Sequence, residues 1–536
     1  MRRRFTALPI VIVLVAAACS ATPSASPSPG QSVAPSGTPV ASPTVVTGGT
    51  ITWGKPAELL EFDPTTSLNG VSWQLFYLVY ETLTEMGPNL DVQPGVAASW
   101  DNPSPTEYDV HLRPGETFSN GRAMTADDVV GTFQRLLDPK TAAFWAAQLP
   151  VKTVSKVDES TVKFELTKPF TPFLAALANA SASILPMKEL NDKSFDVTKE
   201  MLGSGPFMVK EHKQDESWTF ERNPHYWRAG FPVADTIQVK IITDDNARIA
   251  ALRDGSIDIA LFENVDAPQL LKDVANVTTV VQKTTDYYRI DVNEIWDQAK
   301  TLDQGVRFAI SEAIDRGQIR DVALGGLGEP TAATPPGFPD SCDLSAVPSS
   351  AHNLDDAKAK LAAANASNLK FQLIASPVFP TFPLIAQVIQ QNLAAIGVTA
   401  DIAQLEVGDW ETRVFAKNPS EMDAALSYFA GYGDAGMVPA WWDPVASGWD
   451  KGFLKPNDQV NALITQSQAL AAGSAERKQV LQQLCNLVDQ DAGIIPLVTR
   501  PIIVAYRTDR LNANVQPVEG YVDPLRFIQE YSKVSP

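Results

Sequence analysis

Segments typical of strands and segments typical of helices alternate along residues 48 to 536, and no unit repeats at a fixed period. Tyr108, Val110 and Leu112, for example, alternate with polar residues, as expected for a strand with one buried face. Such a mixture predicts an α/β fold. A stretch of about 490 residues is too long for a single hydrophobic core, so we expect two or three domains.

The most clearly bounded helix is predicted between Thr125 and Asp138. The Thr125 hydroxyl can cap the helix while the carboxylate of Asp128, three residues later, bonds back to the backbone. Apolar residues then recur at helical spacing until Asp138-Pro139 ends the segment. Other helices are predicted over 72–83, 247–252, 306–314 and 385–396, and strands over 50–53, 237–242, 257–259 and 502–506.

Residues 1–18 have the order of a signal peptide: three arginines, an apolar stretch from Phe5 to Ala18, and small residues before Cys19. The apolar stretch is shorter than the roughly 20 residues of a membrane-spanning helix, so a permanent span is the weaker alternative. Residues 19–47 are mainly Ser, Pro, Thr, Ala, Val and Gly, which cannot form a core. We predict a disordered tether with a reach on the order of 90 Å.

Charge and motif content exclude several classes of function. The formal net charge of −19 argues against a nucleic-acid partner, which requires a basic face. The four histidines are scattered at positions 111, 212, 225 and 352 and form no compact metal motif. Nucleophile-elbow, phosphate-loop and C-x-x-C motifs are absent from the sequence. Gly431 to Gly436 matches G-x-G-x-x-G, but no helical pattern follows it. We therefore predict neither an enzyme nor a bound cofactor or metal.

The three cysteines suggest two separate roles. Small residues directly before Cys19 resemble a bacterial lipobox, although Ala16 stands where that motif most often has Leu. This resemblance implies a lipid on Cys19, with ordinary secretion and loss of Cys19 as the alternative. In an exported protein, Cys342 and Cys485 are expected to form a disulfide, with two buried thiols as the alternative.

Several motifs occur in an order that resembles one known family. They are YDVHLRPGETFSNGRAMTADDVVGTFQRLLDP within 100–139, GSGPF and RNPHYW within 203–227, the 248–259 segment, VRFAISEAIDR at 306–316, IQQNLAAIGV at 389–398 and IIPL at 494–497. Together they are similar to the extracellular solute-binding proteins of family 5, the peptide/nickel-binding group of ABC importer receptors. The resemblance covers nearly the whole body of the chain.

The resemblance implies a two-lobed, hinged fold of the periplasmic-binding-protein type (class II), with an extra subdomain on lobe I. In this interpretation lobe I combines 48–85, 205–295 and 495–536. The extra subdomain is 86–204, and lobe II is 296–494.

Candidate ligand-binding residues come from two segments. Tyr287, Tyr288 and Asn293 lie where the chain of the family crosses between lobes, although a packed hinge strand explains them equally well. Tyr432, Asp434, Trp441 and Trp442 lie in an aromatic, Gly-rich segment, where burial in the core is the alternative. Peptide-binding members often have an Asp in this segment that pairs with the ligand's amino terminus. Gly431 occupies that place here, and Asp434 follows three residues later.

The functional prediction is a monomeric, lipid-anchored binding protein outside the cytoplasm. By family resemblance it captures a short peptide between its lobes and delivers it to an ABC permease. An oligosaccharide or a nickel chelate is the alternative ligand. A secreted hydrolase and a surface protein that binds another macromolecule are the alternative functions.

Overall fold

The computed structural model describes residues 45–297, 302–377, 380–429, 433–447, 449–516 and 523–534. Contacts divide the chain into residues 1–42 and 43–536, and every described residue belongs to the second unit. The predicted signal peptide, Cys19 and nearly all of the predicted tether lie outside the described residues. Among the residues that are described, no helix combines the length and apolar character needed to cross a bilayer.

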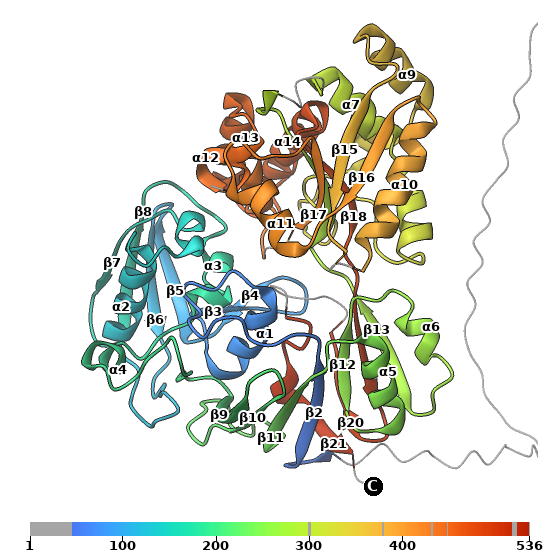
Figure 1. Cartoon of the computed structure of the whole chain (residues 1–536). Helices are drawn as coiled ribbons and strands as arrows, with labels where there is room; N and C mark the ends of the chain where they lie inside the picture. Colours follow the sequence, from blue (N-terminus) through green and yellow to red (C-terminus); the bar gives the residue numbers. More distant parts are fainter. Residues whose placement is uncertain are drawn as a thin grey trace, which may run out of the picture. The chain divides into compact units, whose positions relative to one another are not determined.

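A mixed seven-stranded sheet forms the base of lobe I (Figure 1). Its centre is parallel, because β2 pairs in the same direction with β11 and with β12. Antiparallel strands complete both sides. In sheet order the strands are β13 (Val277–Gln282), β19 (Ile502–Arg507), β12 (Ile259–Phe262), β2 (Thr50–Lys55), β11 (Thr236–Ile241), β10 (Ser217–Arg222) and β9 (Phe207–Lys213).

Helices cover both faces of this sheet. Ile259 and Leu261 of β12 share a core with helix α1 (Gly70–Val79), whereas Ala260 and Phe262 share a core with α5 (Asp245–Asp254) and α6 (Ala267–Leu271). This division follows from the alternation of side chains along a strand. Helix α5 begins where the Asp244 carboxylate accepts the Ala247 amide at 2.7 Å. It ends at Gly255, whose φ of 77° favours glycine.

The extra subdomain is built on a four-stranded antiparallel sheet in the order β5 (Ala97–Ser104), β6 (Glu107–Leu112), β8 (Thr161–Leu166), β7 (Val151–Lys156). Helix α2 (Ala126–Leu137) packs against it, with the Phe133 and Phe164 rings 5.0 Å apart. The predicted cap of α2 is confirmed, since Asp128 accepts the Thr125 amide at 3.1 Å. Short elements complete the subdomain: β3 (Thr84–Met86), β4 (Val92–Pro94), α3 (Phe173–Ala176) and α4 (Met187–Asp192).

Lobe II contains a five-stranded sheet in the order β16 (Thr399–Gln404), β15 (Lys370–Ala375), β17 (Ala424–Phe429), β14 (Tyr287–Val292), β18 (Ile494–Thr499). Its helices are α7 (Gln304–Ala313), α8 (Arg316–Gln318), α9 (Leu354–Ala363), α10 (Phe382–Ala394), α11 (Val407–Glu411), α12 (Pro444–Ser447), α13 (Asp458–Ala469) and α14 (Ala475–Asp491). A small sheet of β1 (Val45–Val46), β21 (Ser532–Val534) and β20 (Leu511–Asn512) joins residues near the two ends of the described chain.

The chain passes between the two large sheets at two points, from β13 to β14 and from β18 to β19 (Figure 1). These crossings are bonded to each other: the Thr284 hydroxyl donates to the Arg500 carbonyl at 2.7 Å, and the Arg500 amide donates to the Asp286 carbonyl at 2.9 Å. Strands β14 and β18 therefore belong to the sheet of lobe II. The sequence-based boundaries, at 295/296 and 494/495, assigned β14 and most of β18 to lobe I. An apolar strand pattern does not reveal which sheet it joins.

Candidate functional site

A cavity of about 190 Å³ lies beside the two crossings and is bounded by both lobes. Lobe I contributes the start of α1 and the end of β12, and lobe II contributes Tyr428 at the end of β17. Arg500 in the second crossing completes the wall. The lining residues are Pro56, Leu68, Asn69, Gly70, Val71, Trp73, Gln74, Leu261, Phe262, Glu263, Tyr428, Arg500, Ile502 and Pro524.

Arg500 is the electrostatic centre of this cavity. Its guanidinium forms ion pairs with Glu263 of lobe I and, at 3.1 Å, with Asp286 of the other crossing. It also lies 4.7 Å from the centre of the Tyr428 ring, which connects it to lobe II. Burial lowers the pKa of Arg500, but attraction to Glu263, Tyr428 and Asp286 outweighs burial and raises it above its ordinary value. One permanent cation therefore faces two carboxylates.

Tyr287, Tyr288 and Asn293, predicted as ligand-binding residues, are all buried and bonded within lobe II. Tyr287 donates its hydroxyl to the Ala333 carbonyl at 3.1 Å. The Tyr288 hydroxyl accepts from the Thr381 hydroxyl at 3.0 Å, and burial raises the pKa of Tyr288 to about 12. The Asn293 side chain donates to the Ser420 carbonyl at 2.8 Å and accepts two backbone amides. These contacts match a packed hinge strand.

The predicted residues of the aromatic segment are dispersed. Tyr432 lies outside the described residues. Asp434 forms an ion pair with the fully buried Arg477, which also pairs with Asp340 at 3.1 Å. Trp441 and Trp442 lie in a short 3-10 helix, Val438–Trp442. Ligand contact by the seven residues predicted from the sequence stays a prediction.

Trp441 takes part in a contact between lobe II and the extra subdomain. Its half-buried ring lies 6.3 Å from the ring of Phe144 and 5.3 Å from the Arg289 guanidinium. Trp449 approaches the same Phe144 ring at 5.6 Å. Nearby, the Thr171 amide donates to the Gln468 carbonyl at 2.7 Å. The side opposite the crossings is therefore also joined, by aromatic rings and a backbone hydrogen bond.

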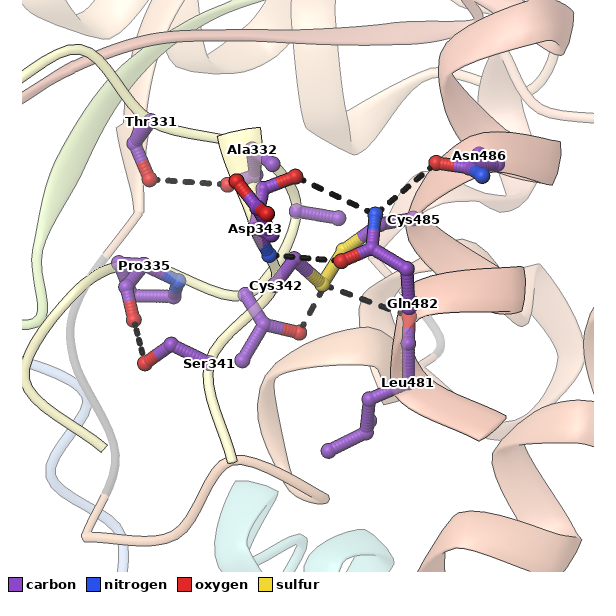
Figure 2. The surroundings of a disulfide bond; sticks show 12 residues. Thr331, Ala332, Pro335, Ser341, Cys342, Asp343, Leu481, Gln482, Cys485 and Asn486 are labelled. Atoms are coloured by element: carbon purple, nitrogen blue, oxygen red, sulfur yellow. Dashed lines mark hydrogen bonds between the residues drawn. A yellow bond between two sulfur atoms is a disulfide. The ribbon is translucent and has the colours of Figure 1, made fainter. Parts of the chain in front are cut away.

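A disulfide joins Cys342 to Cys485 within lobe II (Figure 2). Their Cα atoms lie 6.6 Å apart, and 143 positions separate them in the sequence. Beside the bond, the Gln482 side chain accepts the Asp343 amide at 2.6 Å, so the loop that carries Cys342 is bonded to α14 at two points.

Sequence reasoning did not identify Glu263, Gln74 or Arg500. An isolated charge at the end of an apolar strand carries no motif, and Glu263 and Arg500 are 237 positions apart. The histidines lie on separate elements, and in the part of the chain that the structure describes no group of three or more His, Cys, Asp or Glu side chains could hold a metal ion.

Comparison with known proteins assigns the family. The model of the bacterial extracellular solute-binding proteins, family 5, matches residues 91–452. The chain belongs to this family. Members are substrate-binding proteins of ABC transporters rather than enzymes, and they act outside the cytoplasm. The sequence-based assignments of family and fold are confirmed.

Relatives of this family 5 protein differ in the ligands they are named for. It shares 29% identity over 473 residues with Di/tripeptide-binding protein 4 of Pseudomonas aeruginosa, covering 81% of this chain and 84% of that protein. It shares 26% identity over 557 residues with Heme-binding protein A of Haemophilus influenzae, covering 97% and 98%. The solved structure of the substrate-binding protein CtaP of Listeria monocytogenes has the same fold, with a TM-score of 0.80, 22% identity, and coverage of 91% and 100%.

Proposed function

We propose that this family 5 protein captures a short peptide between its lobes and delivers it to an ABC permease. The observation that carries the proposal is the cavity beside the crossings, which both lobes line and which contains charges of both signs. A peptide carries charged termini and backbone amides, so it matches such a wall. The similarity to a di/tripeptide-binding protein supports the same ligand class.

Cavity size favours a small ligand. Its volume of about 190 Å³ is below the roughly 300 to 1,000 Å³ typical of sites for drug-sized molecules. A di- or tripeptide is a better match to this volume than an oligosaccharide or a heme. A sugar ligand would call for a tryptophan ring that faces it, but Trp442 is buried and Trp441 packs beside Phe144.

Capture requires that the ligand bind one arrangement of the lobes better than another. A ligand in this cavity contacts both lobes and the crossings, so it stabilises the arrangement in which they are close. The contacts of Phe144 with Trp441 and Trp449 add to that arrangement on the opposite side.

We further propose that a lipid on Cys19 holds the protein at the cell membrane, at the end of a tether formed by residues 19–47. The small residues before Cys19 and the Ser/Pro-rich composition after it support this anchor. Replacement of Cys19 by Ser is expected to move the protein from the membrane fraction to the soluble fraction. Unchanged retention in the membrane fraction would contradict the anchor.

Native mass spectrometry of the purified protein tests the ligand class. A series of added masses that match di- and tripeptides, and that disappear on partial unfolding, is the expected result. A single mass of a sugar or of a metal chelate would refute the peptide proposal and leave the receptor role intact. If the purified protein is empty, a randomised tripeptide mixture should raise its midpoint of thermal unfolding, and no shift would count against peptides.

A further inference from the structure

The carboxylates around the cavity can accept more hydrogen bonds than Arg500 donates to them. Arg500 pairs with both Asp286 and Glu263, but the two carboxylates differ in exposure. The Asp286 side chain is 1% exposed, whereas that of Glu263 is 42% exposed and lines the cavity. The Arg500 guanidinium donates to Oε1 of Glu263, and among the described residues Oε2 accepts no hydrogen bond. Glu263 can thus bind a second donor.

Neighbouring cations do not neutralise the remaining negative charge at Glu263. Arg248 lies close enough to Glu263 to interact electrostatically, yet it is itself paired with Asp245 and lies near Asp244. Around Glu263, the two guanidiniums of Arg500 and Arg248 are shared by four carboxylates, those of Glu263, Asp286, Asp244 and Asp245, and of these four Glu263 lines the cavity. The cavity wall at Glu263 therefore attracts a cation.

A second acceptor lines the same cavity. Gln74 on α1 is 9% exposed, and its side-chain oxygen has no hydrogen-bond partner among the described residues. A buried polar atom without a partner is costly, so such an atom beside a cavity indicates a donor supplied by a ligand. An ammonium group has three donors and no acceptor, which suits a carboxylate and an amide oxygen together.

We propose that Glu263, together with Gln74 of the same cavity wall, binds the free amino terminus of the captured peptide. This inference rests on the proposed function. It assigns amine recognition to a carboxylate of lobe I rather than to Asp434 of lobe II. Asp434, the acid nearest to Gly431, is already bound to Arg477 and donates no free charge to a ligand.

A two-by-two comparison tests the proposal. Wild type and Glu263→Gln are each measured with a randomised tripeptide mixture, once with free amino termini and once N-acetylated, by native mass spectrometry and by the midpoint of thermal unfolding. Loss of a hydrogen bond between two charged groups is expected to weaken binding of the free peptides by about 10- to 100-fold. Acetylated peptides should bind weakly, and equally so to both proteins. If Glu263 only positioned Arg500, the substitution would weaken both sets equally, and this outcome would overturn the proposal.

Glu329→Gln is the matched control. Glu329 is also half-exposed and pairs with Lys283 near the crossings at 3.0 Å, but it does not line this cavity. The Glu329→Gln substitution should leave the binding of free and of acetylated peptides unchanged. Equal binding of free and acetylated peptides by the wild type would refute amine recognition and leave the proposed function standing. If the wild type binds neither set, the peptide function itself is refuted.

Discussion

Loss of the Cys342–Cys485 bond is expected to destabilise lobe II strongly. The bond connects the loop before the 3-10 helix Leu344–Ala346 to the middle of α14, across 143 positions of sequence. In the chain-entropy account, a cross-link that closes a loop of this length stabilises the folded state by about 5 kcal/mol, because it restricts the unfolded chain.

The shift in the midpoint of thermal unfolding that corresponds to this free energy depends on how many residues unfold together. With an unfolding entropy of about 2.1 cal/mol/K per residue, 5 kcal/mol corresponds to about 11 °C if the roughly 210 residues of lobe II unfold alone. It corresponds to about 5 °C if the whole body of about 490 residues unfolds together. The size of the shift therefore reports whether the lobes unfold as one unit.

Differential scanning calorimetry of the protein, with and without a phosphine reductant, measures this shift. A Cys342→Ser, Cys485→Ser double variant should melt at the temperature of the reduced wild type and should not respond to reductant. In a chain that also carries Cys19→Ser, thiol titration in denaturant without reductant should detect no free thiol. Two titratable thiols, or an unchanged midpoint on reduction, would refute the reasoning.

Three further predictions concern buried charge and the contact between lobes. Burial raises the pKa of Asp450 to about 8, so the folded protein holds a proton that the unfolded chain releases above about pH 4. Wild-type stability should fall relative to Asp450→Asn as the pH rises from 5 to 8; parallel urea-unfolding curves would contradict this. Arg477→Met leaves the carboxylates of Asp434 and Asp340 without their cation and should cost about 3 to 5 kcal/mol in urea unfolding, whereas a loss below 1 kcal/mol would show that the pairs contribute little. Phe144→Ala removes the ring of the extra subdomain that contacts both Trp441 and Trp449, so small-angle scattering of the ligand-free protein should show a larger radius of gyration, and an unchanged radius would count against a role for this contact.

Local signals predicted many individual elements. The cap at Thr125 and Asp128 located α2, and apolar periodicity ended by a turn residue located α5 and α10. Gly397, with a φ of 83°, follows α10, and a glycine is favoured in this conformation after a helix. These signals work because they depend on residues within a few positions of one another.

Signals that depend on distant partners were not accessible. Strand β14 pairs with β17 and β18, which follow it by more than 130 positions, so its lobe was assigned wrongly. The charged wall of the cavity also depends on distant partners, because Glu263 and Arg500 are brought together where β12 pairs with β19. The orientation of Trp441 and Trp442 also depends on distant residues, because Trp441 packs against Phe144 of the extra subdomain.

The position of β19 affects the order in which the lobes can form. Strand β19 lies between β13 and β12 in the first sheet, although it comes from near the carboxyl end. Lobe II is therefore inserted in the chain between β13 and β19, two strands that pair with each other. A chain synthesised from its amino terminus can complete the sheet of lobe II as soon as β18 is available, while the sheet of lobe I still has a gap at its interior. Long-range closure of this kind is slow, so we expect a partly folded state in which lobe II is native and lobe I exposes the edges of β12 and β13.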